Sequence, residues 1–217
     1  MALFLDANDF ALFTSPDLKH WTRTCDLTIP GCRECPDFFP LFVDGDPQRE
    51  CWVFWGADGS YLIGRFDGTT FSPESEILSA YAGTHSYAAQ TWSDMPEGDT
   101  RRVQISWYRT ETPGMPFNQS MTFPCELTLR RTAEGLRLFS EPVREIATLY
   151  EQTRTWSNKT VSDDGLLLAD LSGDLFDLRV EFTPGSATAF DITVRGMPVT
   201  YDVQQQLLTC QGVFAPL

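Results

Sequence analysis

Short apolar runs separated by turn sequences fill residues 34–70, and no helical period competes with them. Residues 51–55 are apolar at nearly every position, as expected of a strand buried between two layers. Four strands within about fifty residues is the spacing of one β-propeller blade. The sequence therefore predicts an all-β fold built from blades. Three of these strands are expected at residues 38–43, 51–55 and 61–66, and another turn follows at residues 67–70.

The same alternation continues on both sides of this segment. Residues 2–5 and 10–13 are predicted to pair as a hairpin across the polar turn 6–9. Residues 101–107 and 125–130 alternate between apolar and polar side chains, which indicates strands with one buried face.

Beyond residue 160 the alternation returns, and it predicts half-buried antiparallel strands of a β-sandwich. These strands are expected at residues 176–182, 190–194 and 199–203. The predicted domains are a partial β-propeller over residues 1–145, a connector over residues 146–160, and a truncated β-sandwich over residues 161–217.

The charge of the chain excludes two classes of partner. The formal net charge is -14, from 30 acidic against 16 basic residues. Such a surface repels phosphate backbones and anionic lipids, so neither nucleic acid nor a membrane is expected as a partner. The sequence also contains no apolar run of about 18 residues that could span a bilayer.

The six cysteines are expected to be free, because a chain of 217 residues does not need disulfides to fold. Cys32 and Cys35 have the spacing of a zinc knuckle, but no second pair of ligands follows them. His20 and His85 are isolated. We therefore expect neither a metal site nor a cofactor.

The loop that precedes the strand at residues 38–43 carries a glutamate, Glu34, just after a Pro-Gly break at residues 30–31. A carboxyl group held there, between thiols and aromatic rings, is expected to be partly desolvated. Desolvation favours the protonated form, which is the form that a general acid needs. Glu34 is thus a candidate proton donor, although most glutamates at such positions are simply solvated.

Four motifs resemble those of glycosyl hydrolase family 32, the invertases, levanases, inulinases and fructosyltransferases. Glu-Cys-Pro-Asp at residues 34–37, followed by two aromatic residues, resembles the acid/base motif of that family. The other three, in the family's order, are Tyr-Ala-Ala-Gln-Thr-Trp at residues 87–92, Arg-Arg-x-Gln-Ile-x-Trp at residues 101–107, and Phe-Asn-Gln-x-Met-Thr-Phe-Pro at residues 117–124. The resemblance implies an incomplete five-bladed β-propeller, followed by the beginning of a β-sandwich.

The resemblance also implies an activity, the retaining hydrolysis of terminal fructosyl linkages in levan, inulin or sucrose. On this basis Glu34 is the acid/base residue, and Asp37 is a hydrogen-bonding partner that fixes its loop. Trp107 either lines the fructose pocket or ends an alternating strand in the core. Asp58 either reaches a second sugar subsite or is a solvated turn residue.

Three further residues near these motifs are left with simpler expectations. Tyr87 and Gln90 either shape the edge of the pocket or belong to a tightly packed strand. Cys35 is expected on the face opposite to Glu34, where it packs as a small apolar side chain.

Two family motifs do not occur in this sequence, the Asn-Asp-Pro-Asn motif of the nucleophile and the Arg-Asp-Pro motif of the transition-state stabiliser. The nearest matches, at residues 8–10 and 45–47, lack the proline and the arginine. We therefore expect a fragment that lacks at least the first blade and the end of the sandwich, and that is inactive alone. The alternatives are a non-catalytic carbohydrate-binding propeller and a related five-bladed glycosidase.

Overall fold

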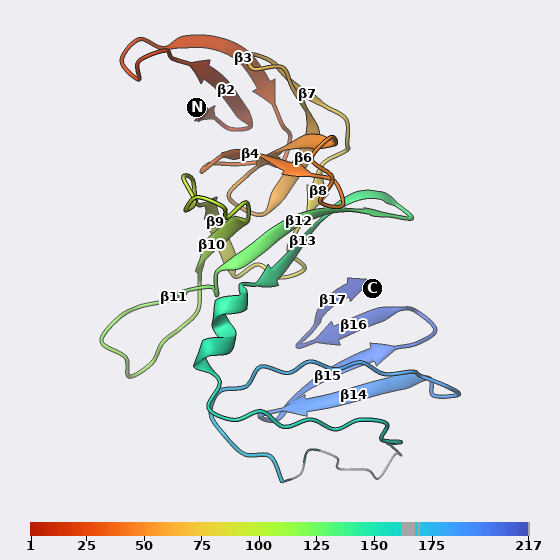
Figure 1. Cartoon of the computed structure of the whole chain (residues 1–217). Helices are drawn as coiled ribbons and strands as arrows, with labels where there is room; N and C mark the ends of the chain where they lie inside the picture. Colours follow the sequence, from red (N-terminus) through yellow and green to blue (C-terminus); the bar gives the residue numbers. More distant parts are fainter. Residues whose placement is uncertain (162–167, 169, 217) are drawn as a thin grey trace. The chain divides into compact units, whose positions relative to one another are not determined.

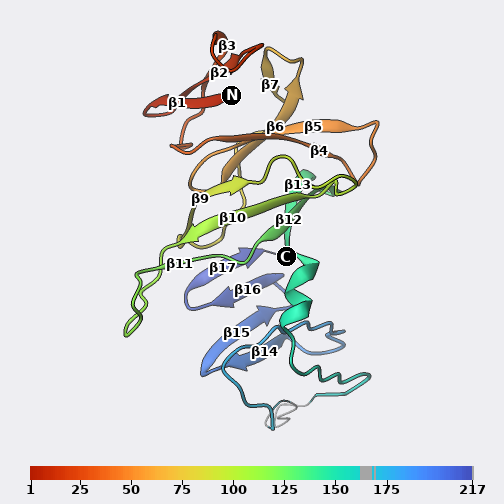
Figure 2. The ribbon, with the colours of Figure 1, turned by 60° about the vertical axis from the view of Figure 1, so that its left-hand side comes forward.

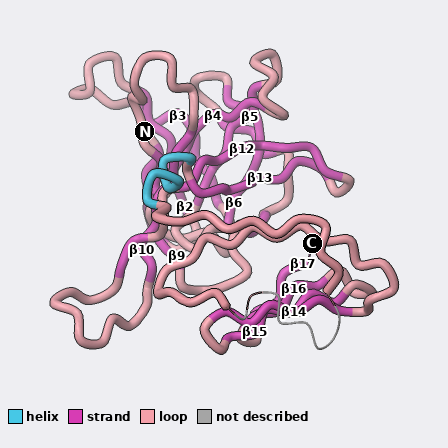
Figure 3. Tube along the Cα trace, turned by 60° about the horizontal axis from the view of Figure 1, so that its bottom comes forward, coloured by secondary structure: helices cyan, strands magenta, loops and turns pink. Residues whose placement is uncertain are grey.

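The computed structural model describes residues 1–161, 168 and 170–216, and it divides into two compact units, Met1–Ile146 and Ala147–Leu217. Within the described ranges the only helix is η1 (Arg144–Leu149), a short 3-10 helix, and all other regular structure is strand (Figure 3). The predicted all-β fold is therefore confirmed. No helix in this part of the chain is long and apolar enough to cross a membrane.

Three antiparallel sheets form the first unit (Figure 1). The first sheet consists of β1 (Ala2–Asp6), β2 (Asp9–Thr14) and β3 (Thr22–Thr28), in that order. The second consists of β4 (Asp37–Phe42), β5 (Glu50–Trp55), β6 (Ser60–Phe66) and β7 (Phe71–Pro73), with β8 (Leu78–Ser79) also paired to β6. The third has the order β11 (Ser120–Met121), β10 (Arg102–Tyr108), β12 (Cys125–Thr132) and β13 (Gly135–Pro142), with β9 (Ser86–Thr91) also paired to β10.

The second sheet lies between two apolar clusters, as the sequence of β5 predicts. Val53 and Trp55 point into a cluster shared with Leu127 and Leu129 of the third sheet. Phe54, on the other face of β5, packs in a cluster with β2 of the first sheet. Because successive strand residues alternate between faces, one apolar strand fills both cores.

The described residues of the second unit include an antiparallel sheet in the order β14 (Ala189–Val194), β15 (Met197–Asp202), β16 (Leu207–Cys210) and β17 (Val213–Pro216). The strands predicted at residues 190–194 and 199–203 are present as β14 and β15. The strand predicted at residues 176–182 is wrong, because these residues have no strand assignment. Phe182 instead stacks its ring on Phe190 at 4.1 Å, so an apolar contact is made there without a backbone ladder.

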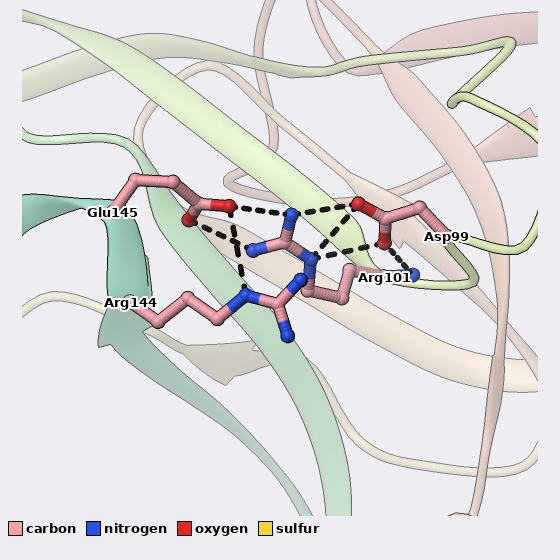
Figure 4. A network of polar contacts seen from close by, with 4 residues as sticks. All are labelled: Asp99, Arg101, Arg144 and Glu145. Atoms are coloured by element: carbon pink, nitrogen blue, oxygen red, sulfur yellow. Dashed lines mark hydrogen bonds and ion pairs between the residues drawn. The ribbon is translucent and has the colours of Figure 1, made fainter.

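An ion network around the largely covered Arg101 side chain lies at the end of the first unit (Figure 4). The Arg101 side chain is only 16% exposed, and its guanidinium group donates to Asp99 at 2.6 Å and to both carboxylate oxygens of Glu145 at 2.9 Å. These hydrogen bonds from Arg101 lower the pKa of both Asp99 and Glu145 to about 2. The network therefore ties the loop before β10 to the first turn of η1.

We expect Arg101→Met to reduce the pH dependence of stability in acid. The folded pKa values of Asp99 and Glu145 lie below their ordinary values of 3.8 and 4.5, so their contribution is complete above pH 4.5 and is lost as pH falls towards 2. Urea unfolding at about pH 6 and about pH 3 measures this difference in the free energy of unfolding. Arg137→Met, which removes an ion pair to the exposed Glu134, is the control and should keep the wild-type pH dependence. An unchanged acid dependence in Arg101→Met contradicts the assignment.

Candidate functional site

The loop that carries Glu34 is anchored at Cys32 and has an uncommon backbone conformation at Glu34 and Cys35. Cys32 is buried, and its backbone N–H donates to the Ile29 carbonyl oxygen at 3.0 Å. Glu34 and Cys35 both have left-handed backbone conformations, with φ of 42° and 37°. Such values are uncommon outside glycine and require surrounding structure to hold them.

Two expectations about this loop are wrong. Glu34 is exposed, so burial does not desolvate it in the described structure. Cys35 is also exposed and does not pack, whereas Cys32 fills the apolar position. The consecutive left-handed residues explain the difference, because they break the regular alternation of faces that an extended strand would have here. All six cysteines are free.

The turn between β5 and β6 holds the backbone of this loop. The Ala57 N–H donates to the carbonyl oxygens of Arg33 at 2.9 Å and Glu34 at 3.2 Å. A Cβ atom on Gly56 would lie 2.1 Å from the Cys32 Sγ, so only glycine allows the turn to approach this closely. These contacts therefore hold the loop that carries Glu34 against the turn between β5 and β6.

Strand β9 contacts the loop through two side chains. The Tyr87 hydroxyl donates to Glu34 Oε2 at 2.7 Å, and the Gln90 Nε2 donates to the Cys35 carbonyl oxygen at 3.0 Å. On the neighbouring strand β10, the ring of Trp107 meets Tyr87 edge to face at 6.3 Å between centroids. Trp107 is 40% exposed, so it is not the core tryptophan of the alternative interpretation.

The hydrogen bond from Tyr87 sets the protonation of that hydroxyl. It raises the pKa of Tyr87 to about 12, with burial as a smaller cause, because ionising the phenol would place two negative charges side by side. Tyr87 therefore stays protonated and remains a hydrogen-bond donor to Glu34. The Arg109 guanidinium lies over the Tyr87 ring at 4.6 Å, a contact that no local sequence pattern indicates.

Asp37 and Asp58 both accept backbone hydrogen bonds. Asp37 is the first residue of β4, and its two oxygens accept backbone N–H bonds from Phe38 at 2.8 Å and Thr91 at 2.6 Å. It thereby connects β4 to β9. Asp58 is exposed in the turn between β5 and β6, where its Oδ1 accepts the Ser60 N–H at 3.1 Å.

A cavity of about 240 Å³ opens beside Glu34. It is lined by Arg33 and Glu34 of the loop and by Phe4, Ala7 and Asn8, which lie on β1 or in the turn after it. No local sequence pattern indicates these neighbours of Glu34, because they come from a different sheet. Within the described residues, no group of three or more His, Cys, Asp or Glu side chains could hold a metal ion.

Comparison with known proteins gives a consistent family. The model of the glycosyl hydrolases family 32 N-terminal domain matches residues 5–142. A levanase of Bacillus subtilis is 35% identical over 210 residues, which cover 85% of this chain and 31% of the levanase. An extracellular exo-inulinase of Aspergillus niger is 25% identical, over 88% of this chain and 41% of the inulinase. The chain thus spans less than half the length of both relatives.

Solved structures agree on the fold. An exo-inulinase from Aspergillus awamori has a TM-score of 0.75 and 19% identity, over 97% of this chain and 50% of that one. A mutant β-fructofuranosidase of Bombyx mori, solved in complex with sucrose, has a TM-score of 0.56 and 16% identity, over 96% of this chain and 48% of that one. Because the family model covers well over half of the chain, we conclude that the chain belongs to glycosyl hydrolase family 32.

Proposed function

We propose that the chain is the acid/base-carrying part of a β-fructosidase that cleaves terminal fructosyl linkages in levan, inulin or sucrose. The observation that carries the proposal is the position of Glu34, whose carboxylate borders a cavity and accepts a hydrogen bond from Tyr87. The names of the relatives support this substrate class, since they include a levanase, exo-inulinases and a β-fructofuranosidase bound to sucrose.

In the proposed reaction, Glu34 donates a proton to the leaving-group oxygen while a second carboxylate attacks the anomeric carbon of the fructosyl unit. Glu34 then takes a proton from the water that hydrolyses the covalent intermediate, so the configuration is retained. Because the Tyr87 hydroxyl occupies Oε2, the transferred proton is assigned to Oε1.

The attacking carboxylate is assigned to no residue of this chain. Both oxygens of Asp37 accept backbone N–H bonds, which leaves Asp37 a supporting role in holding the loop. The sequence also lacks the Asn-Asp-Pro-Asn motif. The proposal is therefore that a longer polypeptide supplies the nucleophile and that this chain is inactive alone, because loss of a nucleophile costs orders of magnitude in rate.

Two residues are proposed to contact the sugar. Trp107 presents an exposed aromatic ring next to Tyr87, and such a ring suits the apolar face of a fructosyl unit. Asp58, exposed in the turn that supports Glu34, is proposed to reach a second sugar.

The test uses a levanase chimera, in which this chain replaces the segment of the Bacillus subtilis levanase that aligns with it. We expect the folded levanase chimera to release fructose from levan, inulin or sucrose, and the isolated chain to release none. Chromatography of the products measures both. A folded chimera that binds these sugars without releasing fructose contradicts the proposal and favours a carbohydrate-binding propeller.

A further inference from the structure

We propose that a one-residue β-bulge at Ala88 in β9 positions the acid/base residue, by turning Tyr87 and Gln90 to the same face of the sheet. This inference rests on the role proposed for Glu34, but its structural part can be tested without any activity. Ala88 is here a positioning residue, because it acts through Tyr87 and Gln90.

The pairing of β9 with β10 contains the bulge (the two strands can be followed in Figure 2). Gln90 lies opposite Ile105, and Tyr87 lies opposite Trp107. Three steps along β9 therefore match two steps along β10, so Ala88 and its successor together oppose a single residue. This is the definition of a β-bulge.

The bulge changes which side chains share a face. In a regular strand, residues three positions apart point to opposite faces. Ile105 and Trp107 are two apart and share a face, and directly opposed residues in an antiparallel pair lie on the same face. Tyr87 and Gln90 consequently share that face as well, and both reach the Glu34 loop.

The backbone of Ala88 provides the local cause. Its φ is 52°, in the left-handed region, where the first residue of one common bulge type is a glycine. Its N–H donates to the Ala57 carbonyl oxygen at 2.7 Å, and the Ala57 N–H in turn binds the loop at Arg33 and Glu34. A chain of backbone hydrogen bonds thus joins the bulge to the loop that it serves.

The two side chains hold different parts of the same short segment. Tyr87 binds the carboxylate of Glu34, whereas Gln90 binds the carbonyl oxygen of Cys35, one residue later. Together they fix both the backbone and the reacting group of a loop that is left-handed at two consecutive positions. Without the extra residue, one of them would point to the other side of the sheet.

Nuclear magnetic resonance of the 217-residue chain, labelled at tyrosine Cζ, tests this inference. Tyr87→Phe identifies the Tyr87 signal, and we expect Glu34→Gln to shift this signal, because it replaces the carboxylate that accepts the Tyr87 hydrogen bond with a neutral amide. Ala88→Gly, which suits a positive φ, should keep this response to Glu34→Gln, whereas Ala88→Val should lose it because a β-branched residue disfavours this conformation. A full response to Glu34→Gln in folded Ala88→Val overturns the proposal.

Two further measurements test the inference. If Ala88→Val does not fold, nuclear Overhauser contacts between β9 and β10 of the wild-type chain test for the bulge. Contacts of Tyr87 with Trp107 and of Gln90 with Ile105 support the bulge, whereas the contacts of a regular register overturn it. In the levanase chimera, Ala88→Val should alter the pH profile of kcat, and Ala88→Gly should keep the wild-type profile. If the Tyr87 signal follows these expectations while Glu34→Gln leaves activity intact, the positioning stands and the proposed function fails.

Discussion

Glu34→Gln in the levanase chimera should lower kcat for sucrose by about 10²- to 10⁴-fold, the range typical of a lost general acid. Glutamine keeps the size of the side chain and can still accept the hydrogen bond from Tyr87, but it has no proton to donate to the leaving group. The rate of fructose release measures the loss.

The nature of the substrate separates the proton donor from a merely structural residue. β-D-fructofuranosyl fluoride has a leaving group that needs little protonation, so Glu34→Gln should impair its cleavage far less than that of sucrose. Glu97→Gln, at an exposed loop position, is the matched control and should leave both rates unchanged. Equal losses on both substrates would show that Glu34 is not the general acid.

Phe54→Ala should destabilise the first unit by about 3–5 kcal/mol, the range for removing a buried phenylalanine. Phe54 is fully buried, and its ring lies 5.1 Å from Phe10 and 6.2 Å from Phe71 between centroids. The substitution leaves a cavity between the first and second sheets. The neighbouring rings of Phe10 and Phe71 belong to different sheets, so they cannot move together to fill it. Urea unfolding followed by tryptophan fluorescence measures the free energy of unfolding.

Phe42→Ala is the control for this experiment. Phe42 lies on the neighbouring strand β4 but is 43% exposed, so its loss should cost about 0.5 kcal/mol or less. Similar losses for the two variants would contradict the assignment of Phe54 to the core shared by the two sheets.

Local patterns in the sequence predicted the strands of the first unit well. The hairpin at residues 2–13 and the apolar strand at residues 51–55 are present, because a period of two and the flanking turns specify a strand locally. The same criterion failed at residues 176–182, where apolar side chains make ring contacts but the backbone pairs with no strand. Alternation indicates a buried face, not the presence of a partner strand.

By itself, then, the sequence determined the all-β class, the family motifs and the loop that carries Glu34. Only the tertiary structure brought Tyr87 to Glu34 across 53 residues of chain and left the carboxylate exposed beside a cavity. It also decided the bulge at Ala88, because an alanine carries no local signal for a positive φ. The physical reason is that strand register depends on pairing between distant segments, and a shift of one residue changes which side chains meet.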